Sequence, residues 1–237
     1  MTTRYYGPLE PCSYLPEQTW RLEYELVSRL TPAEYQRRLE EGWRRFGHSL
    51  FRNRCPKCFA CQSLRVLVEE FRPNRSQRRC AKANQGLTER RITLPSFSRE
   101  KWELYQRFHA FQAEHKGWPE AEGYSRFAYI ASFVDNPLPT EEWQYYRDGR
   151  LVGVGYVDVV PHGLSAIYFF YDPDYRRYSL GTWNILSLIE EARRRGMQYV
   201  YLGFYVRGCR SLEYKANFRP CEVRRPGGYW ERLEECS

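Results

Sequence analysis

The chain has 237 residues, enough for one large domain or two modest domains with hydrophobic cores. Its 20 Tyr, 13 Phe and 7 Trp exclude a disordered protein, and no apolar run approaches the ~20 residues that cross a bilayer. A formal net charge of +8 favours an anionic partner such as nucleic acid. Because the N-terminus lacks the apolar core of a signal peptide, we expect a cytoplasmic protein that enters no membrane.

The first elements are predicted from alternation and from helix-start signals. Apolar and polar residues alternate from Trp20 to Arg29, which is typical of a strand. Thr31-Pro-Ala-Glu34 combines an N-cap threonine, a proline in the first turn and the glutamate of a capping box, and it predicts a helix that ends at Gly47. Two further strands are expected at His48 to Asn53 and at Val66 to Phe71.

A cluster of three cysteines, Cys55-Pro-Lys-Cys58-Phe-Ala-Cys61, lies between those two strands. Thiols at this spacing can converge on one point, because a tight turn directs successive sulfurs to the same side. A fourth ligand must come from elsewhere: we expect Cys12, with Cys80 as the alternative. Zinc in a four-thiolate site and an iron–sulfur cluster both fit this spacing, and three free thiols in a surface loop is the other interpretation.

A basic helix is predicted directly after Asn74, which is its expected N-cap. Four cations share one face of this helix: Arg75, Arg78, Arg79 and Lys82. Like charges at this density repel one another, so tRNA phosphates or a carboxylate would relieve the repulsion through arginine forks. The alternative is a solvated face without a ligand.

The middle of the chain predicts two helices and then a break. Ser98 caps a helix that runs to about His115, and a second helix is expected from Gly123 to Val134. The segment Asp135-Asn-Pro-Leu-Pro139 interrupts the pattern. We place a domain boundary here, with an N-terminal α+β domain in residues 1–135 that carries the cysteine cluster and the basic helix, and a second domain in residues 136–237.

The second domain is expected to continue from three strands into a βαβ unit. Ser179 as N-cap and Gly196 as the closing glycine bound a helix from Leu180 to Arg195. The expected strands are Glu142 to Tyr146, Leu151 to Val160, Leu164 to Tyr171 and, after the helix, Met197 to Val206. This is the layout of GNAT-type acyltransferases, so the predicted fold class is α+β or α/β, with a GNAT-like domain whose mixed sheet is largely antiparallel.

Several short sequences occur in an order that resembles the aminoacyl-tRNA–protein transferases, a family of eukaryotic arginyltransferases and shorter bacterial leucyltransferases. The sequences are Cys12-Ser-Tyr-Leu-Pro16, Gly42-Trp-Arg-Arg45, Arg72-Pro-Asn-Arg-Ser-Gln-Arg-Arg79, Tyr171-Asp-Pro-Asp-Tyr175, Ser179-Leu-Gly181 and Tyr214-Lys-Ala-Asn-Phe-Arg-Pro220. The resemblance covers Cys12 to Trp230. It implies an N-terminal domain with a cysteine-bound metal or cluster and a GNAT-like transferase domain.

The resemblance also implies an activity and its partners. Such an enzyme moves an amino acid from aminoacyl-tRNA to the N-terminal amine of a protein that begins with Asp or Glu, which marks that protein for degradation. The compact length and the Cys12 loop are similar to bacterial enzymes and favour leucine, whereas Gly203-Phe-Tyr205 is also similar to arginyl enzymes and keeps arginine open. Eukaryotic members carry a Cys-x-x-Cys in the first loop, but this chain has Leu15 there, so its ligand set departs from theirs. We expect a monomer.

The candidate catalytic residues lie at the end of the strand before the predicted helix: Tyr171, Asp172 and Asp174. A free α-amine has a pKa of ~7.7–8.0, so the enzyme needs mainly alignment, a modest proton acceptor and stabilisation of the oxyanion. One aspartate would accept the amine proton or hold the ammonium group. The alternative is that Asp172-Pro-Asp174 only forms the turn.

Other residues are candidates for substrate binding. The acidic side chain of the protein substrate needs a cation, and the candidates are Lys215, Arg219, Arg75 and Arg78. Ser179 and Gly181 in the turn would hold the end of the charged tRNA, whose terminal adenosine would stack on Tyr178 or Tyr205 unless these tyrosines belong to the core.

Two other functions are compatible with parts of the sequence. An acyl-CoA-dependent N-acetyltransferase would share the layout, but the segment Arg176 to Thr182 has a single glycine, so no CoA is expected. A metal-stabilised RNA-binding module without activity would account for the basic charge and the cysteine cluster.

Overall fold

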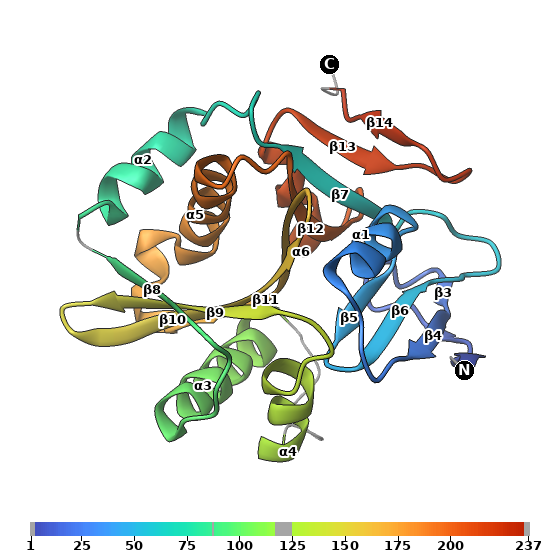
Figure 1. Cartoon of the computed structure of the whole chain (residues 1–237), viewed down its shortest axis with the longest axis horizontal. Coiled ribbons are helices and arrows are strands. Elements are labelled where there is room, and N and C mark those ends of the chain that lie inside the picture. Colours follow the sequence, from blue (N-terminus) through green and yellow to red (C-terminus); the bar gives the residue numbers. More distant parts are fainter. Residues whose placement is uncertain (1–2, 87, 117–124, 235–237) are drawn as a thin grey trace.

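A computed structural model describes residues 3–86, 88–116 and 125–234 of the chain. Its central feature is an eight-stranded sheet in the order β14-β13-β7-β12-β11-β10-β9-β8 (Figure 1). The strands are β7 (Gln62–Leu67), β8 (Glu89–Thr93), β9 (Thr140–Arg147), β10 (Arg150–Val160), β11 (Gly163–Tyr171), β12 (Tyr199–Tyr205), β13 (Cys221–Arg224) and β14 (Trp230–Arg232). Among these strands every neighbouring pair is antiparallel except β11 and β12. A mixed, largely antiparallel sheet with one βαβ unit is therefore confirmed.

Helices cover both faces of this sheet (Figure 1). One face carries α5 (Leu180–Arg194) and α2 (Arg75–Asn84), and the other carries α3 (Arg99–Lys116), α4 (Arg126–Tyr129) and the π-helical turn η1 (Ile130–Val134). The apolar stripe of α5 packs on Val152, Leu164 and Val200 of the sheet, as its helical spacing predicts. On the opposite face, Trp102 and Tyr105 of α3 form an aromatic core with Tyr129 and Phe170.

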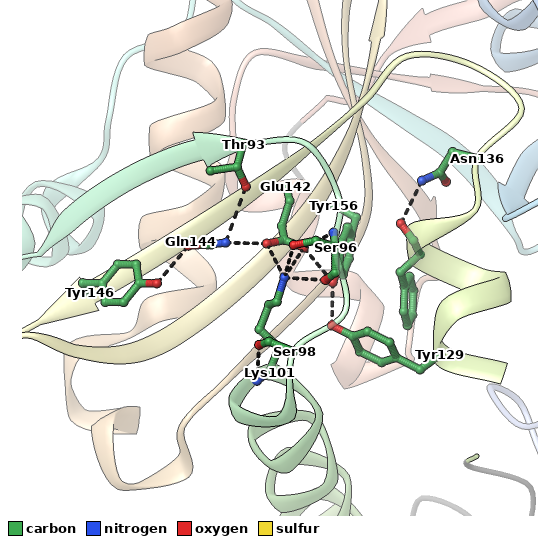
Figure 2. Close-up of polar contacts among 11 residues, drawn as sticks. Thr93, Ser96, Ser98, Lys101, Tyr129, Asn136, Glu142, Gln144, Tyr146 and Tyr156 are labelled. Atoms are coloured by element: carbon green, nitrogen blue, oxygen red, sulfur yellow. Dashed lines mark hydrogen bonds and ion pairs between the residues drawn. The ribbon is translucent and has the colours of Figure 1, made fainter. Parts of the chain in front are cut away.

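A buried polar network fastens α3 to the sheet (Figure 2). Lys101 in the first turn of α3 donates from Nζ to both carboxylate oxygens of Glu142 on β9, at 2.8 and 2.9 Å. Tyr156 donates to the same carboxylate at 3.3 Å, and its own hydroxyl lies 2.5 Å from that of Tyr129. Burial raises the pKa of Tyr156 above its usual range. Because every charge in this network has a partner, the helix is held in one position over the strand.

A second, smaller sheet is built from the N-terminal segment. It contains β1 (Thr3–Tyr6), β4 (Leu22–Leu26), β6 (Ser49–Asn53) and β5 (Arg44–Phe46) in that order, with α1 (Pro32–Glu40) alongside and a two-stranded pair of β2 (Glu10–Pro11) and β3 (Thr19–Trp20). The capping box predicted for α1 is confirmed, because Glu34 N donates to Thr31 Oγ1 and Thr31 N donates back to Glu34.

The two sheets are joined by buried arginine contacts. Arg45 on β5 donates from Nε to Asp158 Oδ2 on β10 at 2.9 Å, and both side chains are fully buried. The same guanidinium donates to Thr140 Oγ1 at 2.7 Å. The large sheet itself takes β7 and β8 from before residue 136 and its other strands from after it. The two predicted domains therefore share this sheet, and their division stays a prediction.

Several predicted boundaries are wrong. The helix after Thr31 ends at Glu40 and not at Gly47, because Gly42 has a φ of +87° that turns the chain, and Arg44–Phe46 then forms β5. The strand predicted at Val66 to Phe71 begins earlier, at Gln62, and β8 was not predicted. The predicted helix from Gly123 to Val134 is seen as α4 and η1, and its first residues lie outside the described part of the chain.

Three short helices complete the chain, all of them close to the ends of β11 and β12. They are η2 (Pro173–Tyr178), α6 (Arg210–Glu213) and η3 (Tyr214–Asn217). No helix in the described ranges is long and apolar enough to cross a membrane.

Candidate active site

The two parallel strands of the βαβ unit separate part-way along their length. β11 and β12 pair only from Gly163 to Ser165 against Tyr199 to Tyr201, although each strand continues for several residues beyond that point. The side chain of Arg44 fills the opening between them. Its Nη1 donates to Ser165 Oγ at 3.0 Å and its Nη2 donates to the carbonyl of Ala166. A Cβ at Gly203 on the other strand would lie 3.3 Å from Arg44 Nε, and the backbone there has a φ of +78°, so glycine suits this position beside the guanidinium.

The turn after β11 is held by the carboxylate of Asp172. This side chain is buried, accepts from the amide of Asp174 at 3.2 Å and pairs with Arg107 at 3.1 Å and Arg150 at 3.2 Å. The turn-forming role of Asp172 is therefore observed, and its carboxylate is already engaged. Asp174 is exposed.

Tyr171 closes the same strand and is half-buried. Its ring lies 5.1 Å from that of Phe108 on α3, and burial raises the pKa of its hydroxyl. Of the three predicted catalytic residues, Asp172 is buried, Tyr171 is half-buried and Asp174 is exposed.

The N-terminus of α5 is open to a ligand. Ser179 occupies the N-cap position with a φ of +53°, and its side chain makes no capping hydrogen bond. A Cβ at Gly181 would meet nothing within 4 Å. The first amides of a 15-residue helix point toward this surface, where they favour an anion.

The basic helix α2 lies directly beside this turn. Asn84 donates to the carbonyl of Tyr178 at 2.8 Å, and the thiol of Cys80 lies 3.6 Å from the carbonyl of Ser179. The opposite side of α2 is exposed and carries Arg75, Arg78, Arg79 and Lys82. The structure thus brings together the basic helix and the turn, which are about a hundred residues apart in sequence.

Nearby arginines extend the basic surface along η2. Arg176 donates to the carbonyl of Pro173 at 3.3 Å, and Arg177 donates to the hydroxyl of Tyr178 at 2.8 Å. Neither these arginines nor those of α2 form an ion pair with a carboxylate in the described part of the chain. The surface is therefore positively charged without internal compensation.

The two tyrosines predicted to stack on adenosine have different surroundings. Arg147 lies 3.8 Å and Arg177 4.8 Å from the ring centre of Tyr178, which is half-buried at the turn. Tyr205 is 8% exposed and belongs to the core between the sheet and α5. Tyr178 is therefore the more accessible of the two, but guanidinium groups already lie over its ring.

Lys215 and Arg219 occupy separate places. Lys215 is half-buried and donates from Nζ to the carbonyl of Phe204 at 2.8 Å. Burial, together with the charge of Arg44, lowers the pKa of this ammonium group to about 7. Arg219 donates to the carbonyl of Leu233 at 2.6 Å and faces a groove that Glu70 and Glu234 also line.

The four predicted metal ligands line one cavity of about 640 Å³, beside the N-terminal sheet. Cys12 reaches it together with Cys55, Cys58 and Cys61, whereas Cys80 lies at the turn before α5. Burial and the neighbouring thiols raise the pKa of Cys61 to about 12. The donor chemistry suits zinc or an iron–sulfur cluster, but in residues 3–86, 88–116 and 125–234 no three Cys, His, Asp or Glu side chains are close enough to hold one metal ion.

Comparison with known proteins identifies the family. The profile of the arginine-tRNA-protein transferase N terminus matches residues 10–79, and that of the C terminus matches residues 100–225. This chain belongs to that family. The enzyme class expected from the sequence is thereby confirmed: the protein is an aminoacyl-tRNA–protein transferase.

Relatives in this family match along most of their length. An aspartate/glutamate leucyltransferase of Campylobacter jejuni (strain 81-176) is 35% identical over 90% of this chain and 89% of its own. Those of Alkalilimnicola ehrlichii and Pseudomonas aeruginosa (strain LESB58) are 41% and 39% identical, over 92% and 90% of this chain and 90% and 89% of their own. A solved domain of a putative lysylphosphatidylglycerol synthetase from Agrobacterium fabrum is 13% identical, with a TM-score of 0.48 over 73% of this chain and 58% of that one.

Several arginines lie in or near the site although the sequence did not predict a role for them. Arg44 and Arg45 lie in the Gly42-Trp-Arg-Arg45 segment, and both reach from β5 into the large sheet. Arg52, Arg54 and Arg224 line the thiol cavity. The dense arginines before Cys55 and after Val223 were the available signal, but only the fold places them in one cavity.

Proposed function

We propose that this transferase moves leucine from leucyl-tRNA to the N-terminal amine of proteins that begin with Asp or Glu, and so marks them for degradation. The observation that carries the proposal is the similarity to aspartate/glutamate leucyltransferases at 35–41% identity over at least 89% of both chains. The alternative is transfer of arginine, because the matching family is described as arginine-tRNA-protein transferase.

The reaction needs few protein groups. The amine nitrogen attacks the ester carbon, the new amide bond forms, and the ester C–O bond breaks as the ribose hydroxyl takes up a proton. The amine must first lose a proton, since it is largely protonated near pH 7. Tyr171, Asp172 and Asp174 were predicted for this step. Of these, the exposed Asp174 is the better proton acceptor, because Asp172 is committed to Arg107 and Arg150.

Lys215 is a second candidate acceptor. It lies on η3 and donates to the carbonyl of Phe204 near the end of β12, where the charge of Arg44 acts on it. With a pKa of about 7, a large fraction of its side chain is neutral at physiological pH and able to take a proton.

The basic surface of α2, η2 and the N-terminus of α5 supports a binding site for the acceptor end of tRNA. Exposed arginines such as Arg75 and Arg78 suit backbone phosphates, and the open amides near Ser179 and Gly181 suit one more. The terminal adenosine would stack on Tyr178 in place of the guanidinium of Arg147 or Arg177.

We further propose a GNAT-like transferase domain that uses no CoA. The separation of β11 from β12 and the helix that follows β11 support the likeness. Arg44 argues against an acetyl-CoA-dependent enzyme, because its guanidinium fills the opening between the strands. The RNA-binding module without activity is not favoured, since the chain belongs to a family of transferases.

The metal site also remains a proposal. Cys12, Cys55, Cys58 and Cys61 would hold zinc or an iron–sulfur cluster after a modest movement of the thiol-bearing loops. A structural centre there would stabilise the fold of these loops, and no step of the reaction needs it. A monomeric state and a cytoplasmic location stay predictions from the sequence.

The decisive experiment for this function is a transfer assay. Purified protein is incubated with labelled leucyl-tRNA, arginyl-tRNA or acetyl-CoA in separate reactions, each with peptides that begin with Asp, Glu or Ala. We expect label from leucyl-tRNA in the Asp and Glu peptides only, whereas transfer from acetyl-CoA without transfer from either tRNA would overturn the proposal.

A further inference from the structure

The thiol cavity is also strongly basic. Five arginines line it, Arg21, Arg52, Arg54, Arg224 and Arg225, against one acidic residue, Glu41. A single carboxylate, that of Glu23, accepts from both Arg52 at 2.7 Å and Arg54 at 2.8 Å. Arg225 pairs with Glu231. The five arginines therefore outnumber the three carboxylates named with them, Glu41, Glu23 and Glu231.

Arg224 reaches the cavity without direct contact to a carboxylate of the described residues. It donates from Nε to the carbonyl of Glu40 at 2.7 Å and forms no ion pair with a carboxylate of residues 3–86, 88–116 or 125–234. Burial lowers its pKa, and the charges of Arg52 and Arg54 lower it further, although Glu41 opposes the shift. An anion in the cavity would relieve this crowding.

Two glycines leave room for the guanidinium of Arg224. A Cβ at Gly42 would lie 3.5 Å from its Nη1, and a Cβ at Gly228 would lie 3.0 Å from its Nη2. Both glycines have positive φ, at +87° and +92°. The hydrogen bond from Nε to the carbonyl of Glu40 orients the guanidinium, and its two terminal nitrogens lie beside glycines.

The cavity lies next to the opening between the parallel strands. Phe204 forms part of its wall, and the carbonyl of the same residue accepts from Lys215. Gly203, the preceding residue, packs against Arg44 in the opening. A ligand in the cavity is thus close to the end of β12, where the candidate acceptor Lys215 lies.

We propose that this cavity receives the first residue of the protein substrate, and that Arg224, flanked by Arg52 and Arg54, binds the carboxylate of its Asp or Glu side chain. The inference rests on the proposed function. It assigns recognition of the acidic N-terminal residue to arginines that were not among the candidates predicted from the sequence. Three guanidiniums around one cavity accommodate carboxylates at two distances from the main chain, which fits acceptance of both Asp and Glu.

The location favours a peptide carboxylate over a tRNA phosphate. The exposed arginines suited to tRNA lie on α2 and η2, and α2 covers the same face of the large sheet as α5 (Figure 1). The cavity is instead lined by residues of the N-terminal sheet and of the segment that contains β13. A cavity of about 640 Å³ holds a few amino-acid residues, and Leu15, Phe59 and Phe204 supply apolar wall for the parts of the peptide that carry no charge.

The test compares Arg224→Gln with the matched control Arg232→Gln, whose arginine lies on β14 and pairs with Glu70. Leucine transfer is measured at varied concentrations of peptides that begin with Asp, Glu or Asn. For Arg224→Gln we expect KM for the Asp and Glu peptides to rise ~10- to 100-fold, because a charge-assisted hydrogen-bonded pair is lost, and the preference for Asp over Asn to disappear. The affinity for tRNA stays at the wild-type value, and the control behaves as wild type.

Each other outcome has a defined meaning. If the wild type transfers leucine but Arg224→Gln keeps its preference for Asp over Asn, the inference is wrong while the function stands. Weaker binding of tRNA with an unchanged KM for peptide would assign the cavity to RNA and overturn the inference. If the wild type transfers to no peptide, the proposed function itself fails.

A second variant tests the inference if Arg224→Gln does not fold. Arg54 is half-exposed and shares Glu23 with Arg52, so Arg54→Gln leaves that carboxylate paired. Should Arg224→Gln not fold, Arg54→Gln decides: we expect a several-fold rise in KM for acidic peptides, and an unchanged preference for Asp over Asn overturns the inference.

Discussion

Arg44 and Ser165 are joined by a 3.0 Å hydrogen bond at the point where the two parallel strands of the large sheet part. Arg44 belongs to the N-terminal sheet and Ser165 to β11, so the bond links the two sheets at the centre of the candidate active site. Because Arg44 is 7% exposed, its charge is held there mainly by protein oxygens. The opening in the large sheet is therefore formed by both halves of the chain.

Replacing Arg44 with Met should destabilise the protein by about 2–4 kcal/mol, since the carbonyl of Ala166 and the hydroxyl of Ser165 lose their donor in a buried setting. Urea unfolding measures the change. Arg91→Gln, which removes an exposed pair with Glu89, is the control and should cost less than about 1 kcal/mol. Equal losses in the two variants would contradict a structural role for Arg44.

Lys215 should give the protein a characteristic dependence on pH. Its pKa is about 7 in the folded state, against an ordinary value of 10.5, so between these values the unfolded chain binds more protons than the folded one. Stability attributable to this group therefore rises as pH increases from about 7 toward 10.5. Thermal melting of wild type and Lys215→Met across this range should show a shallower rise in the variant.

The pKa of Lys215 also predicts how the transfer rate depends on pH. If neutral Lys215 accepts the amine proton, the transfer rate at low peptide concentration should rise with the deprotonation of two groups in the wild type, Lys215 near pH 7 and the peptide α-amine at ~7.7–8.0. Lys215→Met should keep only the rise that belongs to the α-amine. An unchanged pH profile in a folded Lys215→Met variant would leave Asp174 as the remaining acceptor.

The basic face of α2 should govern tRNA binding and not peptide binding. For the double variant Arg75→Gln, Arg78→Gln we expect weaker binding of tRNA and a salt dependence reduced by about two phosphate contacts. The KM for acidic peptides should stay unchanged. Arg99→Gln on α3, an equally exposed arginine, is the control. If affinity for tRNA matches wild type at all salt concentrations, the face is only solvated.

Cys58→Ser should release metal from the purified protein and destabilise the N-terminal sheet, because the cysteine loop would lose its anchor. Metal analysis gives the content, and visible absorption separates a coloured iron–sulfur cluster from colourless zinc. Cys80→Ser alters a thiol that lies at the turn before α5 and should leave metal content unchanged. Wild-type metal content in Cys58→Ser would refute its assignment as a ligand.

Local patterns predicted much of the fold. The three strands of the meander, the helix from Leu180 and the returning strand are found close to their expected residues, because each carries a long periodic pattern with clear turn or glycine signals at its ends. The helix after Thr31 was extended too far, since Trp43 and Phe46 recur at helical spacing although Gly42 has already turned the chain. Trp43 is fully buried all the same, so its apolar character was a signal of burial and not of helix.

The candidate site was less accessible to sequence reasoning. Proximity of α2 to the turn at Ser179 depends on Asn84 and Cys80, whose contacts to that turn span more than ninety residues. The cavity arginines come from β6, the segment after it and β13, and no local pattern relates Arg52 to Arg224. Asp172 illustrates a different difficulty, because a turn-forming and a catalytic aspartate have the same sequence context.

Mass spectrometry of the acceptor peptide tests the central claim most directly. Peptides that begin with Asp, Glu and Ala are incubated with the protein, unfractionated aminoacyl-tRNA and no acetyl-CoA, and their N-termini are then sequenced by fragmentation. The account predicts a single added leucine on the α-amine of the Asp and Glu peptides and none on the Ala peptide. Unmodified acidic peptides, or leucine added equally to all three, would contradict it.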